Sequence, residues 1–368
     1  PVARGEAGHL HLPLRLEPAA SVLLCVDPAA QCPATSVLAA DLPLVSVSRE
    51  EIVGLASQAG RYAVSVGAQR GEPRLLTAAV RAMPQVVELD DEWEFETVAP
   101  NALPLTRWEY DMDSWVMNTD ADANRHVYRA RFESELDPAD ARLLLDGLAV
   151  DKVWKGSTLV NFELLVNGTV VGRSMGGRGD LNIEGMEPGE YLDHYIYEAE
   201  IEGLLVEGPN VIEVRTMGQL YETPNLAHPV ILVGRFAVAG DKARPRLVRE
   251  PGVIDGSGWH LQGYPHFSGV GVYSQTVRLT PAQRKCRLFL EMERPGDLFE
   301  VCVNGRSCGV RAWEPWSVEI TDGVSGSGNL VQIRVANSLQ NLLVQERKPS
   351  GILGRVRIVP RKEVRFRP

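Results

Sequence analysis

The sequence lacks long apolar runs and long runs of basic residues, and each absence argues against a class of partner. No window approaches the ~18 uninterrupted apolar residues that a membrane-spanning helix needs, so we expect no membrane partner. Lys and Arg number 38 against 48 Asp and Glu, which gives a net charge of −10. That charge repels a phosphate backbone and no basic run offsets it, so nucleic acid is not an expected partner.

Motifs for metal, phosphate and nucleophilic chemistry are also missing. The five cysteines form no C-x-x-C pair, and there is no G-x-S-x-G elbow, Walker-type loop or H-E-x-x-H helix. No stretch alternates strands with helices as a catalytic barrel would. We therefore expect no catalytic residue and no cofactor, with one alternative left open. Asp120, Asp122 and Asn124 have the alternating spacing of oxygen ligands, which would suit a structural Ca²⁺.

Turn-forming residues and alternating strands are what the sequence does contain. Glycine occurs 34 times and proline 24 times in 368 residues, which favours short strands over long helices. Apolar and polar residues alternate over residues 273–279, 287–291, 330–335 and 355–359. This pattern is typical of antiparallel strands with one buried face, so many strands of this kind predict two-sheet sandwiches.

An internal repeat indicates how the strands are organised. FELLVNG at 162–168 matches FEVCVNG at 299–305, and each ends on the Asn-Gly pair that favours a tight hairpin. Three further pairs occur in the same order: VY at 127 and 272, RLLL at 142 with RLFL at 287, and NVIEVR at 210 with NLVQIR at 329. We predict that residues 127–238 and 272–359 superpose strand for strand, with both hairpins in equivalent places.

The predicted fold class is all-β, with two tandem antiparallel jelly-roll β-sandwiches after a small β-rich segment. The boundaries are 1–82 for that segment, 83–240 for the first sandwich and 241–368 for the second, with 240–246 as the joint. The segment reads as the tail of a preceding domain.

Within the first segment, residues 10–16, 21–26 and 60–66 are predicted strands. Ser48 to Glu51 have capping-box spacing and predict a short helix ending at Gly60.

The first residues, Pro1-Val2-Ala3-Arg4, carry neither a starting Met nor an apolar signal core, and we expect the chain to belong to a longer polypeptide. The compartment, extracellular or cytoplasmic in a bacterium, stays open at this stage.

An ordered set of motifs in the second copy resembles a known family. They are WHLQGYP at 259–265, FSG at 267–269, Tyr273, VNG at 303–305 with Gly309, ITD at 320–322, Asn329-Leu330, Asn337 with Asn341, and SGILG at 350–354. Together they resemble the galactose-binding-domain-like jelly rolls of family 2-type glycoside hydrolases and α-L-rhamnosidase-like relatives. Arg355 departs from the Pro frequent in that family. The resemblance implies a non-catalytic region whose partner is the missing catalytic domain of the same polypeptide.

Sugar binding by such sandwiches uses an aromatic ring for the apolar face of a pyranose and planar polar groups for its hydroxyls. Two clusters fit this chemistry. The first contains Trp108, Tyr110 and Trp115 among acidic residues, which we expect to lie in a loop. The second contains Trp313 and Trp316, with Asn341, Gln345 and Glu346 in a later loop. The alternative for both clusters is packing in a core or between domains.

The sequence also predicts how exposed two pairs of tryptophans are. Trp313 and Trp316 are three residues apart with Pro315 between them, so at least one should project from a loop. Trp93 and Trp259 begin what we take to be corresponding strands of the two copies, and we expect both in the core.

The functional hypothesis is a non-catalytic, carbohydrate-binding accessory region of a larger glycoside hydrolase. A purely structural or protein-interaction role is the alternative, and a self-contained glycosidase is less favoured because a pair of facing carboxylates is not evident.

Overall fold

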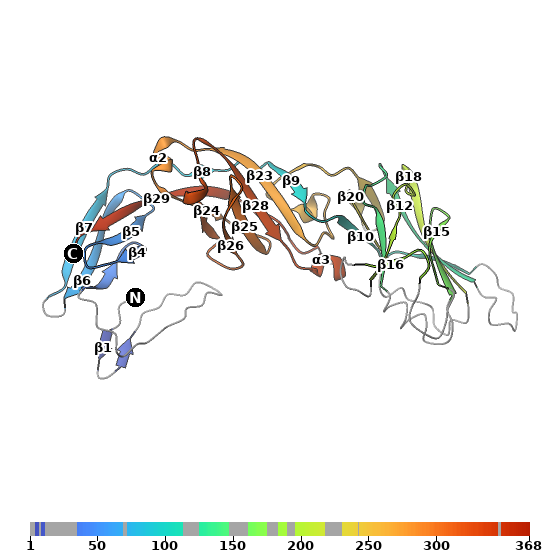
Figure 1. The fold of residues 1–368 in the computed structure, drawn as a ribbon, viewed down its shortest axis with the longest axis horizontal. Coiled ribbons are helices and arrows are strands. Elements are labelled where there is room, and N and C mark those ends of the chain that lie inside the picture. The colour runs from blue at the N-terminus through green and yellow to red at the C-terminus, as the bar shows by residue number, and fades with distance from the viewer. Residues whose placement is uncertain are drawn as a thin grey trace.

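The computed structural model describes residues 4–6, 9–11, 35–68, 72–112, 125–146, 161–174, 183–189, 196–217, 230–241, 243–344 and 347–368. This part of the chain is built from antiparallel sheets, with helices of only three or four residues, so the all-β prediction is confirmed. Three β units follow one another along the long axis of the molecule (Figure 1). No helix among the described residues has the length and apolarity to cross a membrane.

The first sandwich lies at the right of Figure 1 and packs two sheets around one apolar core. One sheet has the order β10-β19-β13-β17-β16, and the other has the order β15-β14-β18-β12-β21-β20 with β11 beside β12. The strands are β10 (Asn101–Leu105), β11 (Glu109–Met112), β12 (Arg125–Ser134), β13 (Arg142–Asp146), β14 (Asn161–Val166), β15 (Thr169–Ser174), β16 (Glu187–Pro188), β17 (Ile196–Glu200), β18 (Gly208–Met217), β19 (Val230–Gly234), β20 (Ala237–Asp241) and β21 (Arg244–Val248).

The second sandwich lies in the middle of Figure 1, and β5 and β4, which extend its second sheet beyond β29, lie at the left with the strands of the N-terminal unit. Its sheets have the orders β22-β9-β23-β28-β25-β26 and β27-β24-β29-β5-β4, with β8 beside β29. The strands are β4 (Leu44–Val47), β5 (Ile52–Ala56), β8 (Val87–Glu88), β9 (Trp93–Thr97), β22 (Val253–Ile254), β23 (Val270–Arg278), β24 (Arg287–Met292), β25 (Leu298–Val303), β26 (Arg306–Arg311), β27 (Ser317–Glu319), β28 (Gly328–Ala336) and β29 (Val356–Phe366).

The same strand order occurs in both sandwiches. The order β15-β14-β18-β12 in the first corresponds to β26-β25-β28-β23 in the second, and β19-β13-β17 corresponds to β29-β24-β27. The two Asn-Gly hairpins therefore join equivalent strands, and each hairpin carries a register shift at the same place along its first strand. Superposition of the two units atom by atom stays a prediction.

The hairpin asparagines explain why these turns form where they do. Asn167 and Asn304 have φ values of 47° and 52°, in the left-handed region that asparagine tolerates better than most residues. The side chain of Asn304 donates to the Gly323 carbonyl oxygen at 3.0 Å and accepts from the Leu330 amide at 3.0 Å. Asn167 makes the matching bonds, to the Leu204 carbonyl oxygen and from the Val211 amide, both at 2.9 Å.

Strand pairing differs from the predicted boundaries in two places on the first sandwich. At the start of the range 83–240, β8 pairs with β29 and β9 pairs with β22 and β23, all of them strands of the second sandwich. Residues 240–246, expected to be the joint, include the turn of the β20–β21 hairpin, and β21 pairs with β12 of the first sandwich. Both differences arise because hydrogen-bond partners far away in the sequence decide where a short strand belongs.

The described strands of the N-terminal segment pack against the C-terminal end of the chain. β3 (Thr35–Ala40), β6 (Gly60–Ala68) and β7 (Arg74–Val80) form a three-stranded sheet, and β6 covers the predicted strand at 60–66. This sheet shares a core with β5 and the C-terminal end of β29, which contribute Ile52, Val364 and Phe366 among others. The last strand of the chain, β29, therefore completes the core of the N-terminal unit.

The helix expected after Ser48 is absent, and a turn and strand replace it. The Ser48 hydroxyl accepts from the Glu51 amide at 3.0 Å, as in a capping box, but the bond closes the turn between β4 and β5. The five residues of β5 are all buried, because the strand is covered on both faces. Of the predicted strand at 10–16, only its start overlaps β2 (His9–His11), and the strand at 21–26 lies outside the described residues.

The two sandwiches pack against each other through α3 (Gln340–Leu343). Leu342 on α3 is buried in a cluster with Ala102, Leu144, Ile231 and Val233, which line the outer face of the β10-β19-β13 sheet. The Asn101 side chain adds hydrogen bonds to the Phe236 and Gly263 carbonyl oxygens at 2.8 and 3.0 Å. This contact covers one outer face of the first sandwich with residues of the second.

Replacing Asn304 should separate the backbone and side-chain contributions of the hairpin. Asn304→Ala loses the side-chain bonds and places a β-carbon at positive φ, so we expect a loss of about 3 kcal/mol in unfolding free energy. Asn304→Gly loses the bonds alone, for a loss of about 2 kcal/mol. Urea unfolding measures both values. Equal stability of Asn304→Ala and the parent chain would contradict this role for Asn304.

Candidate functional site

A groove on the outer face of the second sandwich is the best-formed candidate site. It lies over the sheet β27-β24-β29 beside β8 and has a volume of about 700 Å³, within the usual size range of small-molecule sites. Its lining combines an aromatic ring, a proline and charges of both signs: Glu88, Glu291, Met292, Glu293, Glu314, Pro315, Trp316, Ser317, Arg355, Arg357 and Arg361. We call it the Trp316 groove.

The apolar wall of this groove comes from the loop that joins β26 to β27. Trp316 is half-buried, with its ring centroid 6.2 Å from that of the core residue Phe299. Pro315 lines the groove next to it. Trp313, in the same loop, has 55% of its surface exposed, as the spacing of the pair predicts for at least one ring. One tryptophan is thus anchored on the core, while the other projects into solvent.

The floor of the groove is a three-residue charge cluster set by strand register. Glu291 on β24 lies directly opposite Arg357 on β29. Its carboxylate accepts from the Arg357 guanidinium at 2.9 Å and from that of Arg361 at 2.7 Å. The Arg361 guanidinium also lies 4.1 Å from the ring centroid of Phe289, a cation–π contact. These contacts fix the floor in place.

A second ion pair, Arg287 with Glu319, continues the same sheet face. The Arg287 Nε donates to Glu319 Oε1 at 2.7 Å, and the Thr321 hydroxyl donates to the same oxygen at 2.8 Å. The hydrogen bond from Arg287 is the main reason why the pKa of Glu319 lies below its ordinary value, while partial burial acts in the opposite direction. Glu319 is therefore ionised at neutral pH and holds β27 to β24.

Three charged side chains at the groove are not engaged in this cluster. Among the described residues, the side chains of Glu88, Glu314 and Arg355 have no hydrogen-bond or ion-pair partner. Carboxylates accept and guanidinium groups donate, so these side chains offer both kinds of partner to a bound polyol. The groove thus combines an apolar wall with free polar groups at its rim.

The other residues predicted for this cluster do not join the groove. Asn341 lies on α3 and is 1% exposed, and its side chain fixes the loop that follows α3 by donating to the Lys348 carbonyl oxygen and accepting from the Lys348 amide, at 3.0 and 2.8 Å. Its remaining donor bonds to the Ser350 hydroxyl, so we assign Asn341 to the loop and not to a ligand. Gln345 and Glu346 lie outside the described residues.

Of the first predicted cluster, Trp108 lies in the loop between β10 and β11, and Tyr110 lies on β11 and not in a loop. Trp108 packs at the edge of the first core and donates from Nε1 to the Leu105 carbonyl oxygen at 2.9 Å. Tyr110 lies on β11, is 43% exposed, and has its ring centroid 5.1 Å from that of Tyr128. The nearby acids Glu109 and Asp111 pair with Arg131 and Arg129 on β12.

Four other predicted site residues lie outside the described part of the chain. They are Trp115 and the alternative calcium ligands Asp120, Asp122 and Asn124. In the described part of the chain, no three or more His, Cys, Asp or Glu side chains are grouped as they would be to hold a metal.

Trp93 and Trp259 are both buried, at 2% and 0% exposure, as expected for core residues. They share one core, however, and Trp259 lies in a short 3₁₀ turn instead of a strand of a second copy.

The charged groove residues were not singled out from the sequence. Alternation along 287–291 and 355–359 places Arg287, Glu291 and Arg357 on the outward face of their strands. That alternation does not say which strands are neighbours. The match of RLLL at 142 with RLFL at 287 is a sequence signal that bears on strand order. It indicates that β13 and β24 occupy equivalent places in the two sandwiches.

Comparisons with known proteins place this chain only coarsely. No family model matches it, and no curated protein matches it. Similar solved structures include a rhamnosidase from Novosphingobium sp. PP1Y, at 18% identity over 74% of this chain and 25% of that one, with a TM-score of 0.27. An α-L-rhamnosidase from Streptomyces avermitilis, complexed with L-rhamnose, has 12% identity over 90% of this chain and 40% of that one, with a TM-score of 0.30.

A β-D-mannosidase from Dictyoglomus thermophilum is also similar, at 13% identity over 77% of this chain and 31% of that one, with a TM-score of 0.20. The chain therefore spans less than half the length of each of these glycoside hydrolases. At such identities and scores the likeness assigns no activity to this chain.

Glu319→Gln should weaken the fold in a pH-dependent way. Because the folded-state pKa of Glu319 is lowered, its contribution to stability is complete above the ordinary value of 4.5 and disappears as pH falls through the lower folded-state value. We expect a loss of about 1 kcal/mol at pH 7, given partial exposure of the pair, and a difference near zero at pH 3. Urea unfolding at both pH values measures it. A difference that is unchanged at pH 3 would contradict the ionic origin.

Proposed function

We propose that this chain is a non-catalytic carbohydrate-binding part of a larger glycoside hydrolase, and that the Trp316 groove is its sugar-binding site. The supporting observation is the combination in that groove of the half-buried Trp316 with free carboxylate and guanidinium groups. A pyranose presents an apolar face bordered by hydroxyls, so an aromatic wall beside free polar groups matches it.

The loop of the two tryptophans suits a sugar of more than one unit. Trp316 is fixed against Phe299, so its exposed surface is preorganised for stacking. Trp313, three residues earlier in the loop, offers a second large ring that remains mostly in solvent. We propose that the first ring binds one pyranose and that the second covers a neighbouring unit.

The carboxyl groups support a binding role over a catalytic one. A glycosidase needs one carboxylic acid held at a raised pKa to protonate the leaving group. Asp241, Asp255 and Glu319 each have a pKa below the ordinary value, which is the opposite of what such an acid needs. Hydrogen bonds to backbone amides and hydroxyls lower the first two, and Arg287 lowers the third. The proposal therefore assigns hydrolysis to a separate catalytic region of the same polypeptide.

Removing the exposed ring should weaken sugar binding without harming the fold. For Trp313→Ala we expect a loss on the order of 1 to 3 kcal/mol in glycan binding, which is about 5- to 150-fold in Kd, with an unchanged unfolding midpoint. Tyr110→Ala is the matched control, because Tyr110 is an exposed ring on the other sandwich. A glycan array finds the ligand, and titration of both variants measures its affinity.

The same experiment distinguishes the alternative roles. If Tyr110→Ala weakens binding and Trp313→Ala does not, the site lies on the first sandwich. If the array is silent and Trp313→Ala lowers the unfolding midpoint or disrupts an oligomer, the loop serves a protein interface. Sugar hydrolysis by the purified chain would contradict the non-catalytic role.

A further inference from the structure

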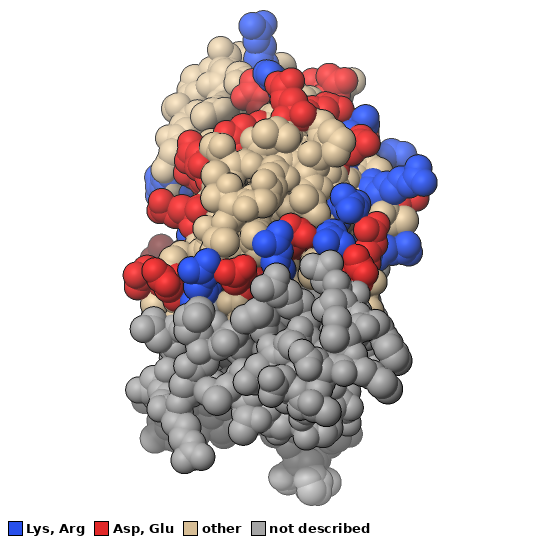
Figure 2. All heavy atoms as spheres, turned by 90° about the vertical axis from the view of Figure 1, so that its right-hand side faces the viewer, with Lys and Arg blue, Asp and Glu red and all other residues tan. Residues whose placement is uncertain are grey.

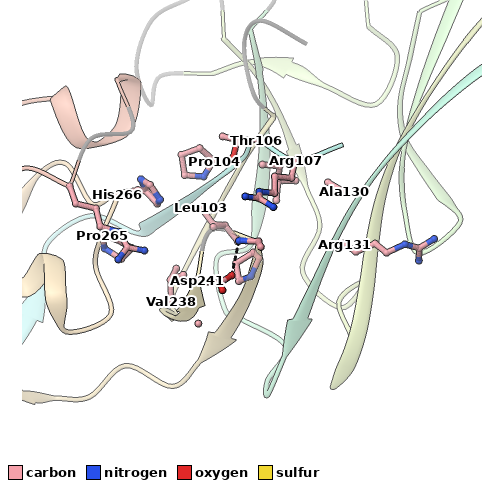
Figure 3. Close-up of a pocket in the computed structure, with 15 residues that line it drawn as sticks. Leu103, Pro104, Thr106, Arg107, Ala130, Arg131, Val238, Asp241, Pro265 and His266 are labelled. Carbon is pink, nitrogen blue, oxygen red and sulfur yellow. Dashed lines mark hydrogen bonds between the residues drawn. The ribbon is translucent and has the colours of Figure 1, made fainter. Parts of the chain in front are cut away.

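A small pocket lies at the junction of the two sandwiches, away from the Trp316 groove. It has a volume of about 50 Å³, enough for a few atoms but not for a sugar ring. β10, β12 and the β20–β21 hairpin of the first sandwich form one side, and Pro265 and His266 of the second form the other (Figure 3). Arg347 of the second sandwich also lines the pocket. We call it the junction pocket.

The described side chains that line this pocket carry more unpaired positive charge than negative charge. Arg107 and Arg347 come from different sandwiches, are exposed, and have no ion-pair or hydrogen-bond partner for their guanidinium groups among the described residues. Asp241 is the acid that lines the pocket with them. Among the described residues, these two arginines against one carboxylate leave one positive charge uncompensated, in a chain whose net charge is −10.

Asp241 is itself held by the hairpin turn. Its Oδ1 accepts from the Ala243 and Arg244 amides at 2.7 and 2.9 Å. These bonds lower its pKa, and the nearby Arg107 charge adds to the effect. Asp241 therefore stays ionised and fixed to the turn, and its contact with Arg107 is through space rather than through a hydrogen bond.

The third arginine of the pocket differs from the other two. Arg131 donates from Nε to Glu109 at 3.0 Å, so its charge is already paired. In Figure 3 its side chain extends away from the pocket centre, while the Arg107 side chain is directed toward the side of the pocket where His266 lies. Arg107 and Arg347 are thus the donors left for an incoming anion.

A wider groove adjoins the junction pocket. It has a volume of about 640 Å³ and shares Arg131, Gly240, Ala243 and Pro245 with the pocket. A pyranose ring fits into that space, and apolar atoms of Pro209, Val211 and Pro245 line it. An acid group in the pocket could therefore stay attached to a ring in the groove.

We propose that the junction pocket binds the carboxylate of an acidic sugar through Arg107 and Arg347, with the sugar ring in the adjoining groove. A planar guanidinium matches a carboxylate in shape as well as charge. One such carboxylate would neutralise the free charge and bridge the two sandwiches. The inference rests on the proposed function only in taking a sugar as the carrier of the acid group, since it uses a different site.

The test compares an acidic trisaccharide with its neutral form. The full chain is titrated with tri-galacturonate and with its fully methyl-esterified form, which keeps the rings but removes the charges. We expect the acid to bind at least tenfold more tightly, and less tightly as salt rises from 50 to 500 mM. Arg107→Gln with Arg347→Gln should abolish that preference. Arg278→Gln, a control at an exposed arginine of β23 that lines neither cavity, should retain it.

Several results would overturn the inference. They are equal affinity for acid and ester, an unchanged preference in the double variant, and an equal loss in Arg278→Gln. Acetate and inorganic phosphate are titrated separately, and either one binding as tightly as the trisaccharide would show a general anion site instead of a sugar site. If neutral glycans still bind in a Trp313-dependent way, the proposed function stands while this inference fails.

Discussion

The architecture depends on β29, a strand that belongs both to the core of the second sandwich and to that of the N-terminal unit. Its first half pairs with β24 and β8 in the second sandwich, and its second half pairs with β5 in the N-terminal unit. Val356 and Ile358 enter one core, while Val364 and Phe366 enter the other. Pro360, which has no backbone N–H to donate, lies between the stretch of β29 paired with β8 and the stretch paired with β5. No hydrogen bond to either of these strands is therefore lost. The register of β29 also places Arg357 opposite Glu291, so the same strand builds the floor of the Trp316 groove.

Charge placement on the outer faces follows from the sandwich design. Each sheet buries one face, so the residues that point outward have to be solvated or paired across strands. Glu163 with Arg215 in the first sandwich and Glu300 with Arg334 in the second are opposite each other in equivalent positions. At the end of the molecule formed by the first sandwich, acidic and basic side chains are interspersed around an uncharged area (Figure 2). Free charges such as Arg107 and Glu314 stand out against this background of pairing.

Local sequence signals predicted the elements well, and long-range pairing was harder to predict. Asn167 and Asn304 marked their hairpins because few residues accept a left-handed turn, and alternation marked the strands between them. Ser48 shows the limit of a local signal, because the same hydroxyl bond can start a helix or close a turn, and burial of Ile52–Ala56 on both faces decides the outcome. For the site, the spacing of Trp313 and Trp316 was sufficient to predict an exposed ring. Asn341 was misleading, because a polar side chain in a loop serves a ligand or the loop itself, and only its contacts show which.

If sugars bind at the loop of Trp313 and Trp316, the indole N–H groups of the protein report the binding directly. The chain has seven tryptophans, each with one indole N–H, so a ¹H–¹⁵N spectrum follows every candidate ring in one titration. With the oligosaccharide selected on a glycan array, we expect the signals of Trp313 and Trp316 to shift in a saturable way while those of Trp93, Trp108 and Trp259 stay in place. Saturable shifts confined to Trp108 or Trp115, with Trp313 and Trp316 unchanged, would contradict it.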